Sequence, residues 1–249
     1  MEIKNSYLNK RNENYNIRNI NFENQEDLKK NSGKFICESN HNDGIWFDSD
    51  FDLRNGVYLY KAKYDETKAL RVYKDTLGVC NDFKFTAYDD YKIVSELLDR
   101  QKHIKLTDFP TGIVTIENYV IGQEIPFYEN ANNLSQIIHL KTQKEIIEYY
   151  INIINILEEL NNNGIVYSDV HAKNFMINSC NNILKLIDFE SKYLSIDNNK
   201  KDLYVYMISN LKNMINRINE KSNINFRLND EETLDELKKE IIKKSKKIM

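Results

Sequence analysis

The chain has 249 residues, of which 41% are apolar and 29% charged, and its formal net charge is −3. These values are ordinary for a folded protein of one large domain or two small lobes, and the small net charge excludes a whole-protein field that would attract nucleic acid or a membrane surface. Three cysteines without a CxxC pair, a polar beginning without the apolar core of a signal peptide and the lack of an apolar run of about 18 residues favour a cytoplasmic protein with no membrane span.

The first half of the chain has the pattern of a small sheet with one helix. Residues 1–34 are polar and weakly patterned, so we interpret them as an extension that could include a short helix, and short β-like runs follow around Gly44. Residues 55–75 alternate on both sides of a polar turn at Asp65-Glu66-Thr67, which predicts a β-hairpin. An amphipathic helix and then two strands are predicted at 87–106, 111–118 and 119–127.

The second half is mostly helical. Asn133 is a good cap for a short helix that ends near residue 140. Residues 141–164 give the clearest helix, with a capping-box pattern at Thr142 and Glu145 and with Gly164 just past its end. Its apolar stripe is Ile146, Tyr150, Ile153, Ile154, Leu157 and Leu160. Two more helices are predicted at about 201–218 and 230–247. A sheet followed by helices predicts an α+β fold with two lobes.

Polar residues stand at the ends of apolar segments in GIVYSDVHAKNFMIN, residues 164–178, and in LKLIDFE, residues 184–190. A short strand at IVY delivers Asp169 to a loop. A hairpin formed by NFMIN and ILKLI would place Asn174 at the start of one strand and Asp188 at the end of the other. The three side chains could then converge, and their oxygens are hard ligands suited to Mg²⁺.

Phosphoryl transfer gives these three residues distinct roles. One aspartate accepts the proton of the acceptor hydroxyl, while another aspartate and an asparagine hold the metal. Asp169 fits the first role, and Asn174 and Asp188 fit the second. The alternative is that Asp169 caps a turn and that the other two are solvated loop residues.

These motifs resemble those of the protein-kinase-like superfamily. YSDVHAKNFMIN is similar to the catalytic loop, and LIDFE is similar to the metal-binding DFG segment. The D-x-H-x-x-N form, with His171 two residues after Asp169, is similar to aminoglycoside and choline kinases. The 13 residues 189–201 that separate Asp188 from Asp202 leave no long activation segment, as in the compact RIO and lipopolysaccharide kinases. The resemblance implies a bilobal α+β fold that uses ATP and Mg²⁺, with an antiparallel N-lobe and a small helical C-lobe.

The resemblance assigns three positions in the N-lobe, and two of them depart from the family pattern. KALRVYK is similar to the strand that carries the phosphate-contacting lysine, but Arg71 stands at that position. Arginine keeps the charge but is not interchangeable with lysine. Glu96 is placed as the helix acid that pairs with Arg71. Only Gly56 stands near the expected glycine-rich loop, which normally cradles the phosphates.

The same resemblance places an interlobe hinge, which would contact ATP, at Gln123, Glu124 and Ile125. It assigns Asp202 to brace the catalytic loop. The implied domains are an extension at 1–34, an N-lobe at 35–125 and a C-lobe at 126–249.

Three functions follow as hypotheses. The first is an ATP- and Mg²⁺-dependent kinase that phosphorylates serine or threonine hydroxyls of a protein. The second is a kinase for a small-molecule hydroxyl, as in a sugar, an amino alcohol or an antibiotic, which the D-x-H-x-x-N form favours. The third is a pseudokinase that binds nucleotide or a partner, which Arg71 and the missing glycines favour. Only about 60 residues follow Asp188, which is little chain for a small-molecule pocket, so the protein kinase is slightly favoured.

Overall fold

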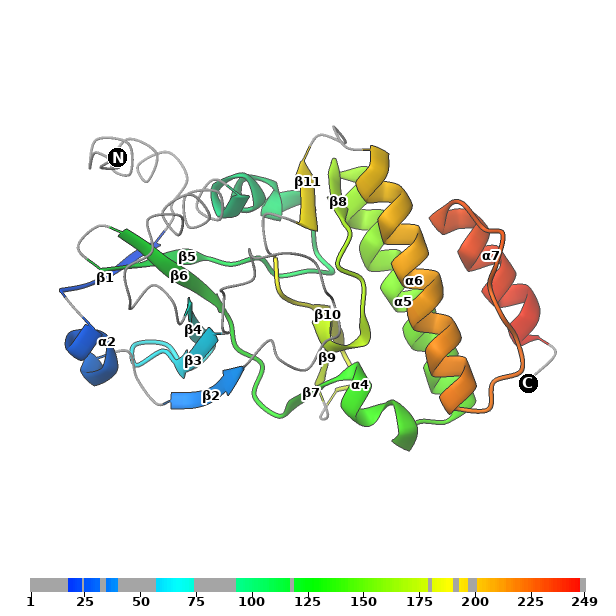
Figure 1. The fold of residues 1–249 in the computed structure, drawn as a ribbon, viewed down its shortest axis with the longest axis horizontal. Helices are drawn as coiled ribbons and strands as arrows, with labels where there is room; N and C mark the ends of the chain where they lie inside the picture. The colour runs from blue at the N-terminus through cyan, green and yellow to red at the C-terminus, as the bar shows by residue number, and fades with distance from the viewer. Residues whose placement is uncertain are drawn as a thin grey trace, which may run out of the picture. The chain divides into compact units, whose positions relative to one another are not determined.

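The computed structural model describes residues 18–23, 25–31, 35–39, 57–73, 93–116, 119–178, 181–189, 193–196 and 201–246. The chain divides into two compact units. Unit 1 comprises Met1–Gln101 and Phe109–Tyr128, and unit 2 comprises Lys102–Asp108 and Glu129–Met249. The described structure is of mixed α+β type, as predicted from the order of the elements (Figure 1).

Unit 1 contains a six-stranded sheet with the order β1-β5-β6-β4-β3-β2. Its strands are β1 (Arg18–Phe22), β2 (Phe35–Ser39), β3 (Val57–Lys61), β4 (Lys68–Tyr73), β5 (Gly112–Ile116) and β6 (Tyr119–Pro126). The predicted hairpin is confirmed, because β3 and β4 pair in antiparallel register around the polar turn. The two further strands are confirmed as β5 and β6, which also form an antiparallel pair. The helix predicted within 87–106 is present at residues 93–100 and continues into the 3₁₀ turn η3 (Gln101–His103).

Within the predicted extension the structure adds a strand, and the short helix considered for this segment is present. There, β1 pairs with β5 in parallel and α2 (Gln25–Asn31) follows it. Phe22 and Leu28 are the apolar anchors of this segment, and both are buried in the core of unit 1. Close approach of the two strands requires Gly112, because a Cβ atom there would lie 2.6 Å from the carbonyl oxygen of Arg18. Burial of Phe22 and Leu28, with Ile20 packed beside them, stabilises a segment whose average composition is polar.

The two faces of the unit 1 sheet have different side chains, because residues alternate along each strand. One face carries the core cluster of Phe22, Leu28, Tyr60, Ala62, Leu70, Val72, Val114 and Ile121. The other face, called the Arg71 face below, carries Arg71 on β4 and Gln123 on β6. These two residues are directly opposite each other in the antiparallel ladder. Directly opposite residues project their side chains from the same face.

Unit 2 is organised around α5 (Gln143–Asn162), whose predicted apolar stripe is fully buried. The Thr142 hydroxyl accepts a hydrogen bond from the Glu145 backbone N–H, and the Glu145 carboxylate accepts one from the Thr142 N–H, so the predicted capping box is confirmed. Gly164 follows the helix with a φ of 75°, a left-handed conformation that glycine adopts without strain. Asn133 caps the short helix α4 (Leu134–Ile137), as predicted, and the 3₁₀ turn η4 (Ile138–Leu140) follows it.

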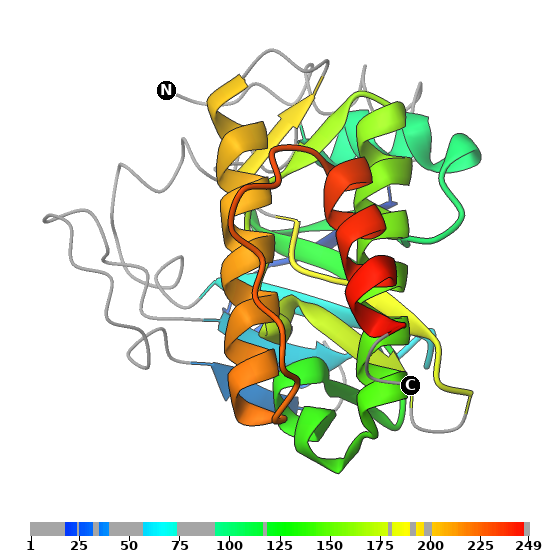
Figure 2. The ribbon, with the colours of Figure 1, turned by 90° about the vertical axis from the view of Figure 1, so that its right-hand side faces the viewer.

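Short strands and two further helices complete unit 2. The strands are β7 (Ala131–Asn133), β8 (Ile165–Tyr167), β9 (Phe175–Asn178), β10 (Leu184–Leu186) and β11 (Leu194–Ile196). The predicted hairpin is confirmed as β9 paired with β10, and β8 pairs with β11. The two predicted helices are α6 (Lys201–Lys221) and α7 (Leu234–Ser245), and α7 packs against α5 (Figure 2).

The boundary between the units differs from the predicted one. Unit 1 extends to Tyr128, three residues beyond the predicted end of the N-lobe, and the segment 102–108 belongs to unit 2. Glu159 on α5 holds this segment, because its two carboxylate oxygens accept hydrogen bonds from the backbone N–H groups of Lys105 and Leu106 at 3.0 and 2.8 Å. Asp108 also forms an ion pair with Lys185 of β10 at 2.9 Å.

Candidate functional site

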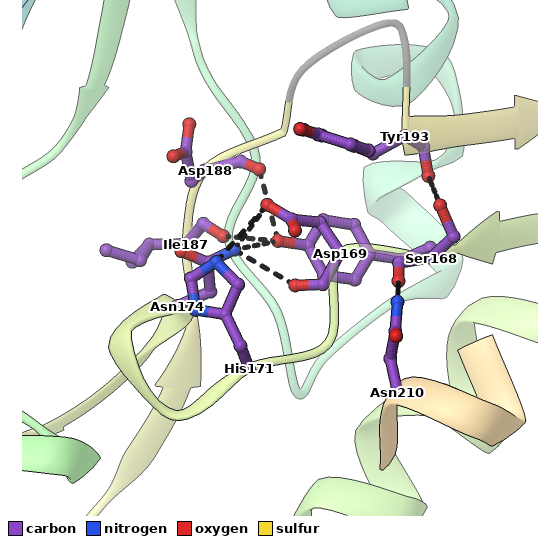
Figure 3. Close-up of polar contacts among 9 residues, drawn as sticks. Ser168, Asp169, His171, Asn174, Ile187, Asp188, Tyr193 and Asn210 are labelled. Carbon is purple, nitrogen blue, oxygen red and sulfur yellow. Dashed lines mark hydrogen bonds and ion pairs between the residues drawn. The ribbon is translucent and has the colours of Figure 1, made fainter. Parts of the chain in front are cut away.

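Asp169 and Asn174 lie in direct contact in the loop between β8 and β9 (Figure 3). The Asn174 side-chain amide donates to Asp169 Oδ2 at 2.9 Å and to the Asp169 backbone carbonyl at 3.0 Å. A single 3₁₀ turn, η5 (Ala172–Asn174), brings the two residues together, and the Asn174 N–H bonds to the His171 carbonyl at 3.0 Å. The sequence predicted their convergence, and the structure confirms it for this pair.

Tyr167 connects this pair to the segment that carries Asp188. Its hydroxyl accepts a hydrogen bond from Asn174 Nδ2 at 2.7 Å and lies 3.3 Å from the carbonyl oxygens of both Ile187 and Asp188. The Ile187 N–H donates to the Asn174 carbonyl at 2.8 Å, so the ends of β8, β9 and β10 are tied together. The sequence analysis did not single out Tyr167. Its position at the end of an apolar strand, two residues before Asp169, could have indicated a role beside the site.

Asp188 has an unusual backbone conformation at this junction. Its φ is 69°, in the left-handed region that residues other than glycine adopt rarely and at a cost. Its side-chain oxygen Oδ1 is buried. A strained, acidic residue at the end of a strand is typical of functional sites, where the surrounding structure stabilises the conformation.

The two carboxylate oxygens of Asp169 have different surroundings. Oδ2 accepts the Asn174 hydrogen bond and lies 3.4 Å from Nε2 of His171. Among the described residues, none donates a hydrogen bond to Oδ1. The Asp169 side chain is 21% exposed and that of His171 46% exposed. One oxygen is therefore fixed by the protein, while the other can accept a proton or a hydrogen bond from a bound molecule.

A second group of contacts holds the loop from the side of β11 and α6. The backbone N–H and the hydroxyl of Ser168 both donate to the Tyr193 carbonyl, at 2.9 and 3.0 Å. The Asn210 side chain on α6 donates to the Ser168 carbonyl at 2.8 Å.

The residue of α6 that braces the loop is therefore different from the one expected. Asp202 lies exposed in the first turn of α6, whereas Asn210, two turns later, makes the contact with the loop. Asn210 could have been recognised in the sequence as a polar residue close to the apolar Met207, Ile208 and Leu211, which are buried on α6.

The described part of the chain has no group of three or more histidine, cysteine, aspartate or glutamate side chains placed to hold a metal ion. The residues predicted as ligands would contribute the carboxylate of Asp188 and the side-chain oxygen of Asn174, since the Asn174 nitrogen is committed to Tyr167 and Asp169. One carboxylate and one amide oxygen form an incomplete set, which suits Mg²⁺ that also binds phosphate oxygens and water. The chemistry of these two side chains is compatible with this ion, and Mg²⁺ binding stays a prediction.

The other candidate residues lie in unit 1. Arg71 is buried in β4, and Glu96 is half-buried on the helix at residues 93–100. Gly56 lies outside the described residues. The pairing of Arg71 with Glu96 stays a prediction.

The predicted hinge at Gln123, Glu124 and Ile125 is corrected by the structure. All three residues lie inside β6, where their backbones pair with β4, and Gln123 and Glu124 also pair with β5. Their backbone groups are therefore engaged within the sheet, and the strand continues to Pro126. The strand itself was predicted at 119–127, but the resemblance ended the N-lobe at residue 125, whereas unit 1 continues to Tyr128. The contact of these three residues with ATP stays a prediction.

The carboxylate of Glu124 explains how a polar residue remains inside this strand. It is 2% exposed and accepts hydrogen bonds from the Thr111 hydroxyl at 2.6 Å and from the Tyr64 hydroxyl. The Arg18 guanidinium lies 3.9 Å from it and 3.7 Å above the Tyr64 ring centroid. Burial and the contact with Glu124 raise the pKa of Tyr64 above its ordinary value.

In comparisons with known proteins, no protein-family model matches this chain, and no curated protein sequence is significantly similar to it. Among the described residues, no helix has the length and apolar character that crossing a membrane requires.

Proposed function

We propose that the chain is a phosphotransferase of bilobal, protein-kinase-like fold that uses ATP and Mg²⁺ to phosphorylate a hydroxyl group. The contact that carries this proposal is the hydrogen bond between Asn174 Nδ2 and Asp169 Oδ2 at 2.9 Å. It fixes one oxygen of a general base and turns the oxygen of a metal-binding amide away from that base. If Asp169 only capped a turn and Asn174 were only a solvated loop residue, this fixed arrangement of the two side chains would not be needed.

The proposed reaction assigns a separate role to each side chain. Asp169 Oδ1 takes the proton of the acceptor hydroxyl as the acceptor oxygen forms a bond to the γ-phosphorus. The bond between the γ-phosphorus and the bridging oxygen breaks, and ADP leaves with the electron pair. Asn174 and Asp188 would hold Mg²⁺, which neutralises charge on the phosphate oxygens when it is bound.

The remaining charge comes from unit 1 in this proposal. Arg71 would contact the phosphates with its guanidinium, which can bind two phosphate oxygens at once. Arginine is a fixed cation at neutral pH, so its charge does not depend on Glu96. A pseudokinase is the second candidate, and the specific observation in its favour is that arginine stands where the resemblance places lysine.

The decisive experiment separates binding from transfer. Calorimetry with Mg·ATP should give a saturable heat, and incubation with γ-labelled ATP should transfer label to the chain itself or to an added acceptor. We favour a serine or threonine hydroxyl of a protein, and aminoglycosides, choline and sugars test the small-molecule alternative. Binding without transfer to any of these acceptors would favour the pseudokinase. The absence of any nucleotide binding would contradict the proposal.

A further inference from the structure

Gln123 is a buried amide with an unsatisfied donor. It lies in the middle of β6, between β4 and β5, and is only 1% exposed. Its Nε2 atom is buried, and no described residue accepts a hydrogen bond from it. Among the described residues of unit 1, it is the one side chain with such an atom. Buried amides without partners are destabilising, so native proteins rarely retain them without a reason.

The neighbouring polar residues on the same strands show that this sheet can satisfy buried polar groups. Both carboxylate oxygens of Glu124 accept hydrogen bonds. The Thr115 hydroxyl on β5 lies 2.9 Å from the side-chain oxygens of both Asn19 and Asn21 on β1. The unsatisfied amide of Gln123 is therefore specific to its own position.

The Gln123 side chain projects from the Arg71 face of the sheet. Arg71 on β4 and Ile113 on β5 are its direct cross-strand neighbours, so all three side chains share this face. Glu124, the next residue, projects from the opposite face toward Tyr64 and Thr111. A ligand whose phosphates reach Arg71 would thus meet the carboxamide of Gln123 on the same surface.

A carboxamide carries a donor and an acceptor side by side, and this pattern has a known complement. Glutamine pairs with adenine by donating to N7 and accepting from the N6 amino group. Guanine presents two acceptors, N7 and O6, on the same edge, so it can satisfy only one half of the carboxamide. The terminal torsion of glutamine is broad, which lets the carboxamide rotate to meet a base.

We propose that Gln123 recognises the N6/N7 edge of adenine and makes the site selective for ATP over GTP. The inference rests on the proposed function, because it requires that the chain binds a nucleoside triphosphate. It assigns Gln123 a side-chain role in base recognition, whereas its backbone remains committed to the sheet.

The test compares wild type with Gln123→Met, which keeps the length of the side chain and removes the carboxamide. Affinities for the Mg²⁺ complexes of ATP, GTP and inorganic tripolyphosphate would be measured by calorimetry. In the variant, ATP should bind about tenfold more weakly, within the range that one bidentate base contact provides. GTP and tripolyphosphate should change less than about twofold. Gln143→Met, the same change at the start of α5 in unit 2, is the matched control and should bind like wild type.

A change in the ligand tests the same contact without a mutation. Wild type should bind 7-deaza-ATP, which lacks the N7 acceptor, about tenfold more weakly than ATP, and Gln123→Met should bind both equally. The ligand-free variant should also melt at a higher temperature than wild type, because an unsatisfied buried amide has been removed.

The outcomes separate the two proposals. If wild type binds ATP, but neither the methionine variant nor 7-deaza-ATP weakens binding, this inference is overturned and the proposed function stands. If wild type binds no nucleotide at all, both are overturned. Equal wild-type affinities for ATP and GTP would also overturn the inference.

Discussion

The hydroxyl of Tyr167 lies 2.7 Å from the side-chain amide of Asn174 in a fully buried contact. The same hydroxyl lies within 3.3 Å of the carbonyl oxygens of Ile187 and Asp188. One oxygen atom thus positions both the amide that faces Asp169 and the strand end that carries Asp188. In the proposed function, Tyr167 would therefore act as a positioning residue.

Tyr167→Phe should lower both stability and phosphate transfer. The Asn174 amide and the carbonyls of Ile187 and Asp188 lose the hydroxyl as a partner. Such a loss typically lowers the unfolding free energy by about 1–3 kcal/mol, which urea denaturation would measure. Tyr150→Phe is the matched control, because the Tyr150 hydroxyl makes one buried hydrogen bond to Asn219 at 2.9 Å, away from the site. Both variants should lose stability, but only Tyr167→Phe should lose transfer activity at temperatures where both are folded. Equal activities of the two variants would contradict the positioning role.

Asp169→Asn should separate catalysis from nucleotide binding. Asparagine can still accept the hydrogen bond from Asn174, but it cannot take a proton from the acceptor. We expect near-native Mg·ATP affinity by calorimetry and at least about a 10²-fold lower rate of phosphate transfer, the lower end of general-base contributions. A variant that transfers phosphate at the wild-type rate would show that Asp169 is not the base.

Asn210→Ala and Asp202→Ala test which residue of α6 supports the loop. The Asn210 amide donates to the Ser168 carbonyl at 2.8 Å, whereas Asp202 is exposed on the same helix. We expect Asn210→Ala to reduce stability by about 1 kcal/mol and to slow phosphate transfer, because the carbonyl loses its donor. Asp202→Ala should behave like wild type in both measurements. The reverse order of effects would restore Asp202 as the brace.

Asp188→Gly separates the metal role of this residue from its backbone conformation. Glycine adopts the φ of 69° without strain, so stability of the ligand-free protein should remain within about 1 kcal/mol of wild type. The Mg²⁺-dependent part of the ATP-induced melting shift should disappear, because the carboxylate is gone. Asn130→Gly, at an exposed position with a φ of 59°, is the control and should retain the full shift. A full shift in Asp188→Gly would refute the ligand assignment.

Glu145 should make stability depend on pH in the acid range. Hydrogen bonds from the backbone N–H and hydroxyl of Thr142 hold the pKa of Glu145 below its ordinary value. The folded protein then binds fewer protons than the unfolded chain, so this stabilisation is present above the unfolded pKa of about 4.3 and is lost as pH falls through the folded pKa.

Glu145→Gln tests this linkage, since glutamine can also complete a capping box. It should reduce the slope of unfolding free energy against pH between about pH 5 and 3. Glu148→Gln, an exposed change on the same helix, should keep the wild-type slope. If Glu145→Gln lowered the unfolding free energy equally at about pH 5 and about pH 3, the cause would be the capping geometry and not the charge.

The sequence predicted best what short-range chemistry determines. The caps at Asn133 and Thr142, the stripe along α5 and the hairpin of β9 and β10 all depend on residues a few positions apart. The contact of Asp169 with Asn174 belongs to the same class, because the two residues are only five positions apart.

Long-range pairings could not be predicted in the same way. The parallel pairing of β1 with β5 joins segments about 94 positions apart, and Ile20, Phe22 and Leu28 are the apolar residues of the N-terminal segment that pack in the core. The resemblance assigned Glu124 to a hinge, and nothing in the local sequence indicated how its charge would be accommodated inside the strand. Its partners Tyr64 and Thr111 are remote in sequence, and their hydrogen bonds allow it to remain in the middle of the sheet.

The hold of Glu159 on residues 105 and 106 has a consequence for dividing the protein into fragments. Neither unit is one continuous stretch of chain, because 102–108 belongs to unit 2 while the chain on both sides of it belongs to unit 1. A fragment that starts at Glu129 would leave the Glu159 carboxylate without two amide donors and Lys185 without Asp108. A separately expressed unit 2 would therefore need the 102–108 peptide, either fused to it or supplied in trans.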